Sequence, residues 1–237
     1  MPRQEANPSM NPRTRSQEAF VFDLDGTLVD SVYQHVMAWR EALGAEGIEL
    51  SMWRIHRKVG MSGGLMTDML LRETGVELDR AKADRLRRRH DDAYRARLAE
   101  VRPLPGAHRL LSSLGEWGIP WAIATSGRTD VAALTLAKLE IDLERVPVVT
   151  RDQVKRAKPD PDLFLAAAER LRAPMSHVTV VGDSVWDMLA AQRARSLGIG
   201  LLSGGYGEEE LERAGAYRVF NDPADMLDHL DEIGGRR

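Results

Sequence analysis

The chain has 237 residues, enough for one full domain and a smaller one, because single hydrophobic cores usually split above roughly 200 residues. A hydrophobic fraction of 43% and a charged fraction of 29% are typical of a globular protein and argue against a disordered or membrane chain. The net charge of -3 provides no general field for nucleic acid or membrane, and the lack of cysteine excludes disulfides, thiolate nucleophiles and cysteine-ligated zinc.

Residues 1–18 are predicted to form a disordered N-terminal arm. They contain three prolines and three arginines but no apolar stretch, so they do not have the pattern of a secretory signal. We therefore expect a cytoplasmic protein. We also expect a monomer or homodimer whose partners are neither nucleic acid nor membrane.

Short apolar runs predict the buried strands of a parallel sheet. These runs cover residues 19–22, 121–124, 146–149, 178–181 and 198–202. Helical spacing of apolar residues over 130–140 and 162–171 separates some of them. This alternation of strands and helices predicts an open α/β sheet.

Residues 31–101 contain no strand-like run and are predicted to form a helical insert. Its first helix places Val32, Val36, Trp39 and Leu43 on one face, and its last covers about 79–100. Prolines end that last helix, so residues 26–30 and 102–106 are the predicted hinges. The core would then be discontinuous, formed by 19–30 and 102–237.

Two carboxylates, Asp23 and Asp25, follow the first predicted strand in the segment Asp-Leu-Asp-Gly-Thr. Side chains two residues apart share a face of a strand, and ligands bind at the carboxyl edge of such sheets. Carboxylates this close repel unless a cation lies between them, and hard oxygen ligands favour Mg²⁺. The alternative interpretation is an ordinary turn or helix N-cap.

A second apolar strand ends in Gly182-Asp183-Ser184, with Asp187 four residues after Asp183. Asp183 would complete the cation site. Asp187 would lie in the first turn of a helix, where it could either support the site or simply stabilise the helix electrostatically.

A third strand ends in Thr125-Ser126-Gly127, whose hydroxyl and N–H groups could hold phosphate oxygens, although such loops are commonly plain turns. Lys158 lies in a proline-rich segment before a helix and offers a cation to the same edge. Its alternative role is that of a surface lysine.

These segments, in this order, resemble the four motifs of the haloacid dehalogenase superfamily. The insert after the first motif resembles the helical cap of the phosphoglycolate phosphatase and β-phosphoglucomutase branch. The resemblance covers nearly the whole chain after the arm and implies a Rossmann-like parallel sheet with an inserted α-helical cap. It rests on Asp23-x-Asp25-Gly26-Thr27, Thr125, Lys158-Pro159-x-Pro161-Asp162 and Gly182-Asp183-Ser184-x-x-Asp187.

The resemblance implies a Mg²⁺-dependent phosphatase that acts on a small phosphorylated metabolite, such as a phosphoglycolate-like compound or a sugar phosphate. Asp23 would be the nucleophile that forms an aspartyl-phosphate, and Asp25 the general acid/base. Mg²⁺ would be held by the Asp23 carboxylate, the Asp25 backbone carbonyl and Asp183. The presence of Asp25 argues against the dehalogenase branch, which lacks this second acid.

The resemblance also implies that Thr125, the Ser126 N–H and Lys158 stabilise the charge of the transferred phosphoryl group. In the cap, His35 and Trp39 resemble a pair in β-phosphoglucomutase and sugar-phosphate phosphatases, although Trp39 could instead be core and His35 an edge residue. Ser62 lies in a segment, 59–64, that resembles the specificity loop of the cap.

The roles of several arginines and the choice between a phosphatase and two alternative functions stay open. Arg128 could meet a substrate anion or could simply be solvated, and the arginines from 85 to 89 suggest a solvated helix face. Segment 59–64 lacks the arginine of the glucose-phosphate mutase, which favours a phosphatase over the alternative of a phosphomutase. A third alternative is a non-catalytic binding protein on the same fold.

Overall fold

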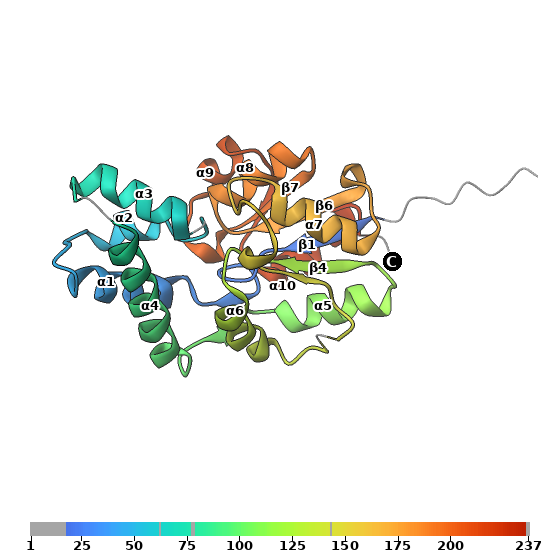
Figure 1. The fold of residues 1–237 in the computed structure, drawn as a ribbon. Helices are drawn as coiled ribbons and strands as arrows, with labels where there is room; N and C mark the ends of the chain where they lie inside the picture. The colour runs from blue at the N-terminus through green and yellow to red at the C-terminus, as the bar shows by residue number, and fades with distance from the viewer. Residues whose placement is uncertain (1–17, 62, 77–78, 143, 236–237) are drawn as a thin grey trace, which may run out of the picture.

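The computed structural model describes residues 18–61, 63–76, 79–142 and 144–235, so the predicted arm, apart from Glu18, lies outside the described residues. Figure 1 shows a helical body beside an α/β body. The strands are β1 (Ala19–Phe22), β2 (Val29–Asp30), β3 (Arg102–Pro103), β4 (Trp121–Ala124), β5 (Val148–Val149), β6 (Val178–Gly182), β7 (Leu197–Leu201) and β8 (Ala216–Phe220).

The α-helices are α1 (Val32–Gly44), α2 (Met52–His56), α3 (Gly63–Thr74), α4 (Arg80–Arg97), α5 (Ala107–Glu116), α6 (Thr129–Leu136), α7 (Asp162–Leu171), α8 (Val185–Ala194), α9 (Glu208–Arg213) and α10 (Pro223–Asp228). Short 3₁₀ helices are η1 (Ala137–Leu139), η2 (Arg151–Gln153), η3 (Met175–His177), η4 (Leu202–Gly204) and η5 (Leu230–Ile233).

The main sheet has six parallel strands in the order β5-β4-β1-β6-β7-β8. The predicted α/β class and five of these strands are confirmed, with shifted bounds in three: β5 begins at Val148 and not at 146, β6 extends to Gly182, and β7 covers Leu197–Leu201 and not 198–202. Pro147, which has no N–H to donate to a ladder, immediately precedes β5. Strand β8 was not predicted, because its residues at the sheet edge are mostly exposed or half-buried and form no apolar run.

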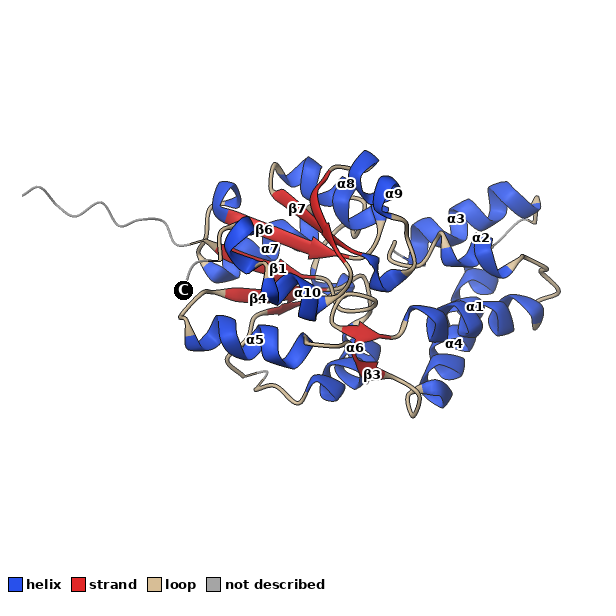
Figure 2. Ribbon diagram, turned by 180° about the vertical axis from the view of Figure 1, so that it is seen from behind, coloured by secondary structure: helices blue, strands red, loops and turns tan. Residues whose placement is uncertain are grey.

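Alternate residues of β1 face opposite layers of helices. Phe20 and Phe22 pack into a cluster with residues of α5 and α10, whereas Ala19 and Val21 pack into a cluster with residues of α7 and α8. Figure 2 shows these helices on the two sides of the sheet. Because β1 is buried on both faces, its run is wholly apolar, and the first polar residue after it lies at the edge of the sheet.

The segment predicted as a helical insert contains α1 to α4, and the division of the chain into core and cap stays a proposal. Below, "the cap" means residues 31–101. Its own apolar cluster includes Val36, Trp39, Leu43 and Leu86, and Trp186 of the α/β body packs against it. The predicted first and last helices of the insert correspond to α1 and α4.

The two predicted hinge segments lie side by side. Strands β2 and β3 pair antiparallel, with Val29 opposite Pro103 and Asp30 opposite Arg102. The N–H of Leu104 also donates to the carbonyl of Leu28, at 2.9 Å. Both chain crossings between cap and core are therefore joined in one short ribbon.

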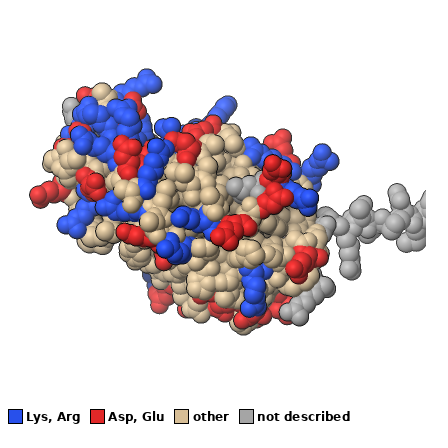
Figure 3. All heavy atoms as spheres, turned by 90° about the horizontal axis from the view of Figure 1, so that it is seen from below, with Lys and Arg blue, Asp and Glu red and all other residues tan. Residues whose placement is uncertain are grey.

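The arginines of α4 are largely paired with acidic residues. Arg85 and Arg89 contact Glu46, and Arg97 contacts Glu41. Basic side chains gather at the cap end of the face shown in Figure 3, while both signs mix over the rest. Among the residues that the structure describes, none of the helices is both long enough and apolar enough to cross a membrane.

Candidate active site

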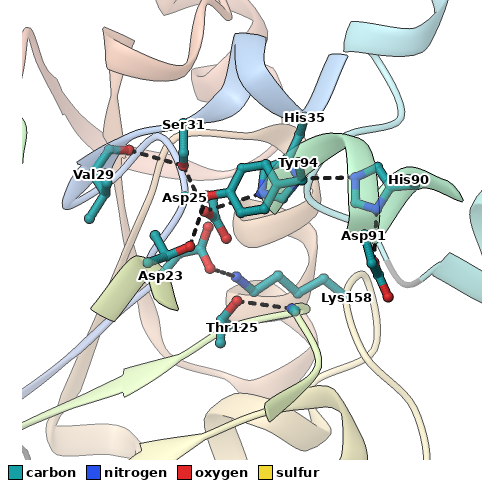
Figure 4. Close-up of polar contacts among 12 residues, drawn as sticks. Asp23, Asp25, Val29, Ser31, His35, His90, Asp91, Tyr94, Thr125 and Lys158 are labelled. Carbon is teal, nitrogen blue, oxygen red and sulfur yellow. Dashed lines mark hydrogen bonds and ion pairs between the residues drawn. The ribbon is translucent and has the colours of Figure 1, made fainter. Parts of the chain in front are cut away.

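Three neighbouring strands deliver polar side chains to one edge of the sheet. Asp23 follows β1, Thr125 follows β4 and Asp183 follows β6, and β1 lies between the other two strands. The ladder continues into these residues, because Asp23 N–H donates to the carbonyl of Val181 at 2.8 Å. The sheet thereby holds the predicted nucleophile on a rigid element (Figure 4).

Lys158 reaches this edge from the loop before α7 and is fully buried. Its Nζ donates to Oδ1 of Asp23 and lies 2.8 Å from Oδ1 of Asp187. Burial alone would lower the pKa of Lys158, but the charges of Asp187 and Asp23 outweigh it and raise that pKa. The lysine is therefore a fixed cation at the site, and its alternative role as a surface residue is wrong.

The buried position of Asp23 disfavours its ionised form. Burial raises the pKa of Asp23 to about 7, although the charge of Lys158 acts in the opposite direction. A further cation near the carboxylate would favour its ionised form, which is the form that a nucleophile needs.

Asp183 faces Asp23 inside a tight cradle. Its Oδ1 accepts a hydrogen bond from Thr27 Oγ1 at 3.0 Å. A Cβ at Gly26, which has a φ of +83°, or at Gly204 would lie 2.5 Å or 1.8 Å from Oδ2 of Asp183. Only glycine allows this approach. Burial, with the charges of Asp187 and Asp23, raises the pKa of Asp183 well above its usual range.

The carboxylates of Asp23, Asp183 and Asp187 each offer an oxygen, and these atoms lie within 4.8 Å of one another. Hard oxygen donors this close fit a divalent cation, which would relieve their mutual repulsion, and the pKa values of Asp23 and Asp183 are both raised. Asp187 differs from the other two, because its Oδ1 faces Lys158 and its Oδ2 accepts from the N–H and hydroxyl of Ser184. It caps α8 through Ser184 and contacts Lys158, and these contacts suit both of the roles left open for it.

Asp25 lies beside the hinge and contacts the first helix of the cap. Its Oδ1 accepts from Ser31 Oγ at 2.6 Å and lies 3.3 Å from Nε2 of His35. Burial works to raise the pKa of Asp25, but the contacts with His35 and Ser31 outweigh it and lower that pKa. The two predicted catalytic carboxylates therefore have pKa values shifted in opposite directions, a pattern common where two acids take different catalytic roles.

The turn after β4 forms a pocket edge suited to phosphate oxygens. Thr125 is buried, and its Oγ1 accepts from the N–H of Gly127 at 2.9 Å. The hydroxyl of Ser126 is buried and has no hydrogen-bond partner among the described residues. Arg128 is exposed, lies 3.4 Å from Asp130 and borders the same cavity.

A cavity of about 530 Å³ lies between this edge and the cap. Besides the predicted residues Asp23, Asp25, His35, Thr125, Ser126 and Arg128, it is lined by residues that the sequence analysis missed as site residues, notably Lys58, Met61, Arg87, His90, Asp91 and Arg151. Arg87 thus differs from Arg85, Arg88 and Arg89, with which it was predicted to form a solvated helix face, because it lines the cavity and they do not. Ser62 lies outside the described residues. Trp39 is buried in the cap cluster and also borders the cavity.

The cap also contacts the core away from the hinge ribbon. The carbonyl of Arg57 accepts from Trp186 Nε1 at 3.1 Å and from Tyr206 Oη at 3.2 Å. The Arg57 guanidinium lies 2.8 Å from Glu210. Nε2 of His56 lies 2.7 Å from the carbonyl of Gly204, next to the cradle of Asp183. The cap therefore covers the site in this conformation.

Comparisons with known proteins agree with this geometry. A haloacid dehalogenase-like hydrolase model matches residues 17–195. A phosphoglycolate phosphatase from Caulobacter vibrioides is 32% identical, over 86% of this chain and 87% of that protein. The β-phosphoglucomutase of Bacillus subtilis is 29% identical, over 79% of this chain and 84% of that protein.

The fold comparison points the same way. The crystal structure of a hydrolase from Pseudomonas syringae superposes with a TM-score of 0.91 at 55% identity, and the match covers 92% of this chain and 100% of that one. This chain therefore belongs to the haloacid dehalogenase-like hydrolases.

Proposed function

We propose that the protein is a Mg²⁺-dependent phosphatase of small phosphate monoesters that works through an aspartyl-phosphate on Asp23. The observation that carries the proposal is the buried arrangement of Asp23, held by Lys158 next to Asp25, at the edge of a cavity that the cap covers. The similarity to a phosphoglycolate phosphatase supports it.

In the first step, the Asp23 carboxylate attacks phosphorus and the bond from phosphorus to the leaving oxygen breaks. Asp25 gives its proton to that oxygen, which departs as an alcohol. A phosphate dianion beside Asp25 favours the protonated carboxyl that this step needs, because like charges disfavour ionisation. Lys158, Thr125 and the N–H of Ser126 stabilise the charge on the phosphoryl oxygens.

In the second step, the Asp25 carboxylate takes a proton from water while the water oxygen attacks phosphorus. The bond between Asp23 and phosphorus breaks, inorganic phosphate leaves, and both carboxyl groups return to their initial states. Water must enter at this stage only, which suits a cap that covers the cavity.

The oxygen donors fit Mg²⁺, and we propose that the Asp23 carboxylate, the Asp25 backbone carbonyl and Asp183 hold it. When bound, Mg²⁺ supplies positive charge that favours the ionised nucleophile and neutralises the phosphoryl group. Asp187 supports the site through Lys158 and Ser184.

The substrate is proposed to be a small phosphorylated metabolite, phosphoglycolate-like or a sugar phosphate. His35, Arg128 and Ser62 are the candidates for contacting its non-transferred part. The similarity to β-phosphoglucomutase favours, as a second candidate, transfer between sugar phosphates by the same residues.

The test is phosphate release from a panel of sugar phosphates, phosphoglycolate and nucleotides, with Mg²⁺ or with chelator, for the wild type and Asp23→Asn. Asp160→Asn, outside the cavity, is the matched control. The proposal is supported if the wild type and Asp160→Asn hydrolyse a substrate with Mg²⁺, and if hydrolysis is lost with chelator and in Asp23→Asn. Activity that survives Asp23→Asn contradicts it. Transfer that requires a sugar bisphosphate, with little phosphate release, would identify a mutase.

A further inference from the structure

A line of four polar side chains runs from Asp25 into the cap (Figure 4). Oδ1 of Asp25 lies 3.3 Å from Nε2 of His35, and Nδ1 of His35 lies 3.1 Å from Nε2 of His90. Nδ1 of His90 lies 3.0 Å from Oδ1 of Asp91. Asp25 belongs to the core, His35 to α1, and His90 and Asp91 to α4. Every ring nitrogen in the line has a partner.

Packing fixes the planes of both imidazole rings. The ring of His35 stacks on Tyr94 with centroids 3.8 Å apart, and the ring of His90 stacks on Trp39 at 4.3 Å. His90 is buried, and it lies between Leu86 and Tyr94 on the apolar stripe of α4. An apolar side chain could fill this place in the core. The presence of a histidine whose two ring nitrogens both contact polar neighbours therefore indicates a role in positioning those neighbours.

The donors and acceptors along the line have one consistent order. Burial lowers the pKa of His90 to about 4, so at neutral pH its ring has one N–H and one acceptor nitrogen. A carboxylate can only accept, so Asp91 takes the N–H on Nδ1 of His90, which leaves Nε2 as an acceptor. His35 must then donate from Nδ1. The nitrogen that remains for Asp25 is Nε2 of His35.

We propose that His90 and Asp91 are positioning residues that hold His35 in the tautomer and ring orientation that present its Nε2 to Asp25. This inference rests on the proposed role of Asp25 as general acid/base. His90 and Asp91 act through His35, so neither is itself a catalytic residue. Neither residue belongs to the four motifs.

The consequence for catalysis follows from the 3.3 Å contact. With Nδ1 committed to His90, Nε2 is the ring nitrogen of His35 that can face Oδ1 of Asp25, so the line fixes how the ring meets the proposed general acid/base. If His90 or Asp91 is lost, the ring of His35 can turn or take its other tautomer, and the partner that orients the Asp25 carboxyl group toward the leaving oxygen is no longer fixed.

The first test compares two kinds of leaving group in the full-length protein. An alkyl phosphate from the panel needs a proton on its leaving oxygen, whereas para-nitrophenyl phosphate releases a weak base and needs little acid help. In His90→Phe, which keeps a ring against Trp39, and in Asp91→Leu, we expect kcat/KM for the alkyl phosphate to fall about 10- to 100-fold. The value for para-nitrophenyl phosphate should change far less.

Two further variants separate positioning from packing and from substrate binding. His90→Gln, whose amide oxygen can accept from His35, should recover much of the activity, and Arg88→Gln on the exposed side of α4 should be unchanged. KM should stay within about twofold, because positioning alters the chemical step and not uniform binding. An equal loss for both substrates, or a rise in KM alone, would overturn the inference.

The second test observes the tautomers directly and needs no activity. Long-range ¹H–¹⁵N correlation spectra of the imidazoles can be assigned with single variants, because the chain has only 6 histidines. In the wild type we expect protonation of His90 at Nδ1 alone and of His35 at Nδ1. Asp91→Leu should shift His90 toward the other tautomer. Protonation of His90 at Nε2 in the wild type would refute the order of donors.

The two proposals can fail separately. If the wild type and Asp25→Asn are equally inactive on the whole panel, the proposed function fails, while the spectra still decide the order along the line. If Asp25→Asn is inactive and His90→Phe keeps full kcat/KM on the alkyl phosphate, the phosphatase proposal stands and the positioning role is wrong.

Discussion

Nζ of Lys158 lies 2.8 Å from Oδ1 of Asp187, and both side chains are fully buried. The same nitrogen donates to Asp23, so one cation balances two carboxylates. Removing one partner of a buried ion pair leaves an uncompensated charge, which costs about 3–5 kcal/mol. This relationship links the stability of the fold to the proposed nucleophile.

Lys158→Met should therefore affect both stability and activity. We expect a loss of about 3 kcal/mol or more in the free energy of unfolding. Phosphatase kcat/KM should fall by about 10³-fold, since the charge facing the phosphoryl group is lost as well. Urea denaturation and steady-state kinetics measure the two effects. Lys155→Met, three residues away and exposed, is the control and should change neither.

Ser126→Ala should separate binding from stability. The Ser126 hydroxyl is buried without a partner among the described residues, so its removal breaks none of their hydrogen bonds and should leave stability unchanged or slightly higher. A hydrogen bond to a phosphoryl oxygen is worth about 1.5–3 kcal/mol, so kcat/KM should fall about tenfold or more. Thermal denaturation with kinetics tests this. Unchanged kinetics would mean that the hydroxyl does not meet substrate.

Mg²⁺ should stabilise the protein more at alkaline than at acidic pH. The pKa of Asp23 is raised to about 7 in the metal-free fold, so the folded state binds more protons than the unfolded chain between about pH 4 and 7. The contribution of Asp23 to stability therefore falls as pH rises through this window. A cation that favours the ionised form of Asp23 restores the stability that is lost as the pH rises.

The increase in unfolding free energy with Mg²⁺ should be larger at pH 8 than at pH 6, and should reach about 2.7 kcal/mol at 100 times the dissociation constant. Asp183→Asn should remove most of it, whereas Asp160→Asn should keep it. Thermal shift with and without chelator provides the measurement. Equal stabilisation of wild type and Asp183→Asn would place the cation elsewhere.

His90 should make the protein sensitive to mild acid. Burial lowers its pKa to about 4, so the unfolded chain, with an ordinary pKa of about 6.5, takes up a proton that the folded protein does not. The stability that depends on neutral His90 is complete above about pH 6.5 and is lost progressively as the pH falls toward 4.

This sensitivity should disappear in His90→Phe. Relative to the variant, the wild type should lose up to about 3 kcal/mol between pH 7 and about pH 4, measured by urea denaturation at fixed ionic strength. Subtracting the free energy of unfolding of the variant from that of the wild type at each pH removes the contribution of groups that titrate in both proteins. Parallel pH profiles would show that His90 is not neutral in the fold.

The core part of the site could be predicted because local sequence determines it. Asp23, Thr125 and Asp183 each follow an apolar run, and the carboxyl ends of adjacent parallel strands meet at one edge. Strand β8 escaped prediction because an edge strand that is exposed on most of its length has no apolar run to reveal it.

The cap part of the site depends on packing between distant segments. Whether Arg87 or Arg88 faces the cavity depends on how α4 packs on α1, which no local pattern gives. His90 did leave a signal, because it occupies the apolar stripe of Leu86 and Tyr94 at a spacing of four residues. Lys58 left none, since its burial depends on Glu73, 2.6 Å away on α3.

The contacts of Arg57 with the core should control how often the cap opens. Trp186→Phe removes one of the two hydrogen bonds to the Arg57 carbonyl, worth about 1 kcal/mol, and keeps a ring against the cap cluster. Glu210→Gln weakens the half-exposed ion pair with Arg57 by up to about 1 kcal/mol. Together they should shift the opening equilibrium by up to about 30-fold.

Hydrogen exchange detected by mass spectrometry measures this opening. In the double variant, amides of α2 and residues 57–61 should lose protection, while β1 and β6 should keep theirs, since the sheet does not open with the cap. Glu209→Gln, whose partner Arg213 is exposed, is the control on the same helix. If α2 keeps its protection, the hinge ribbon alone holds the cap in place, and access to Asp23 does not depend on Arg57.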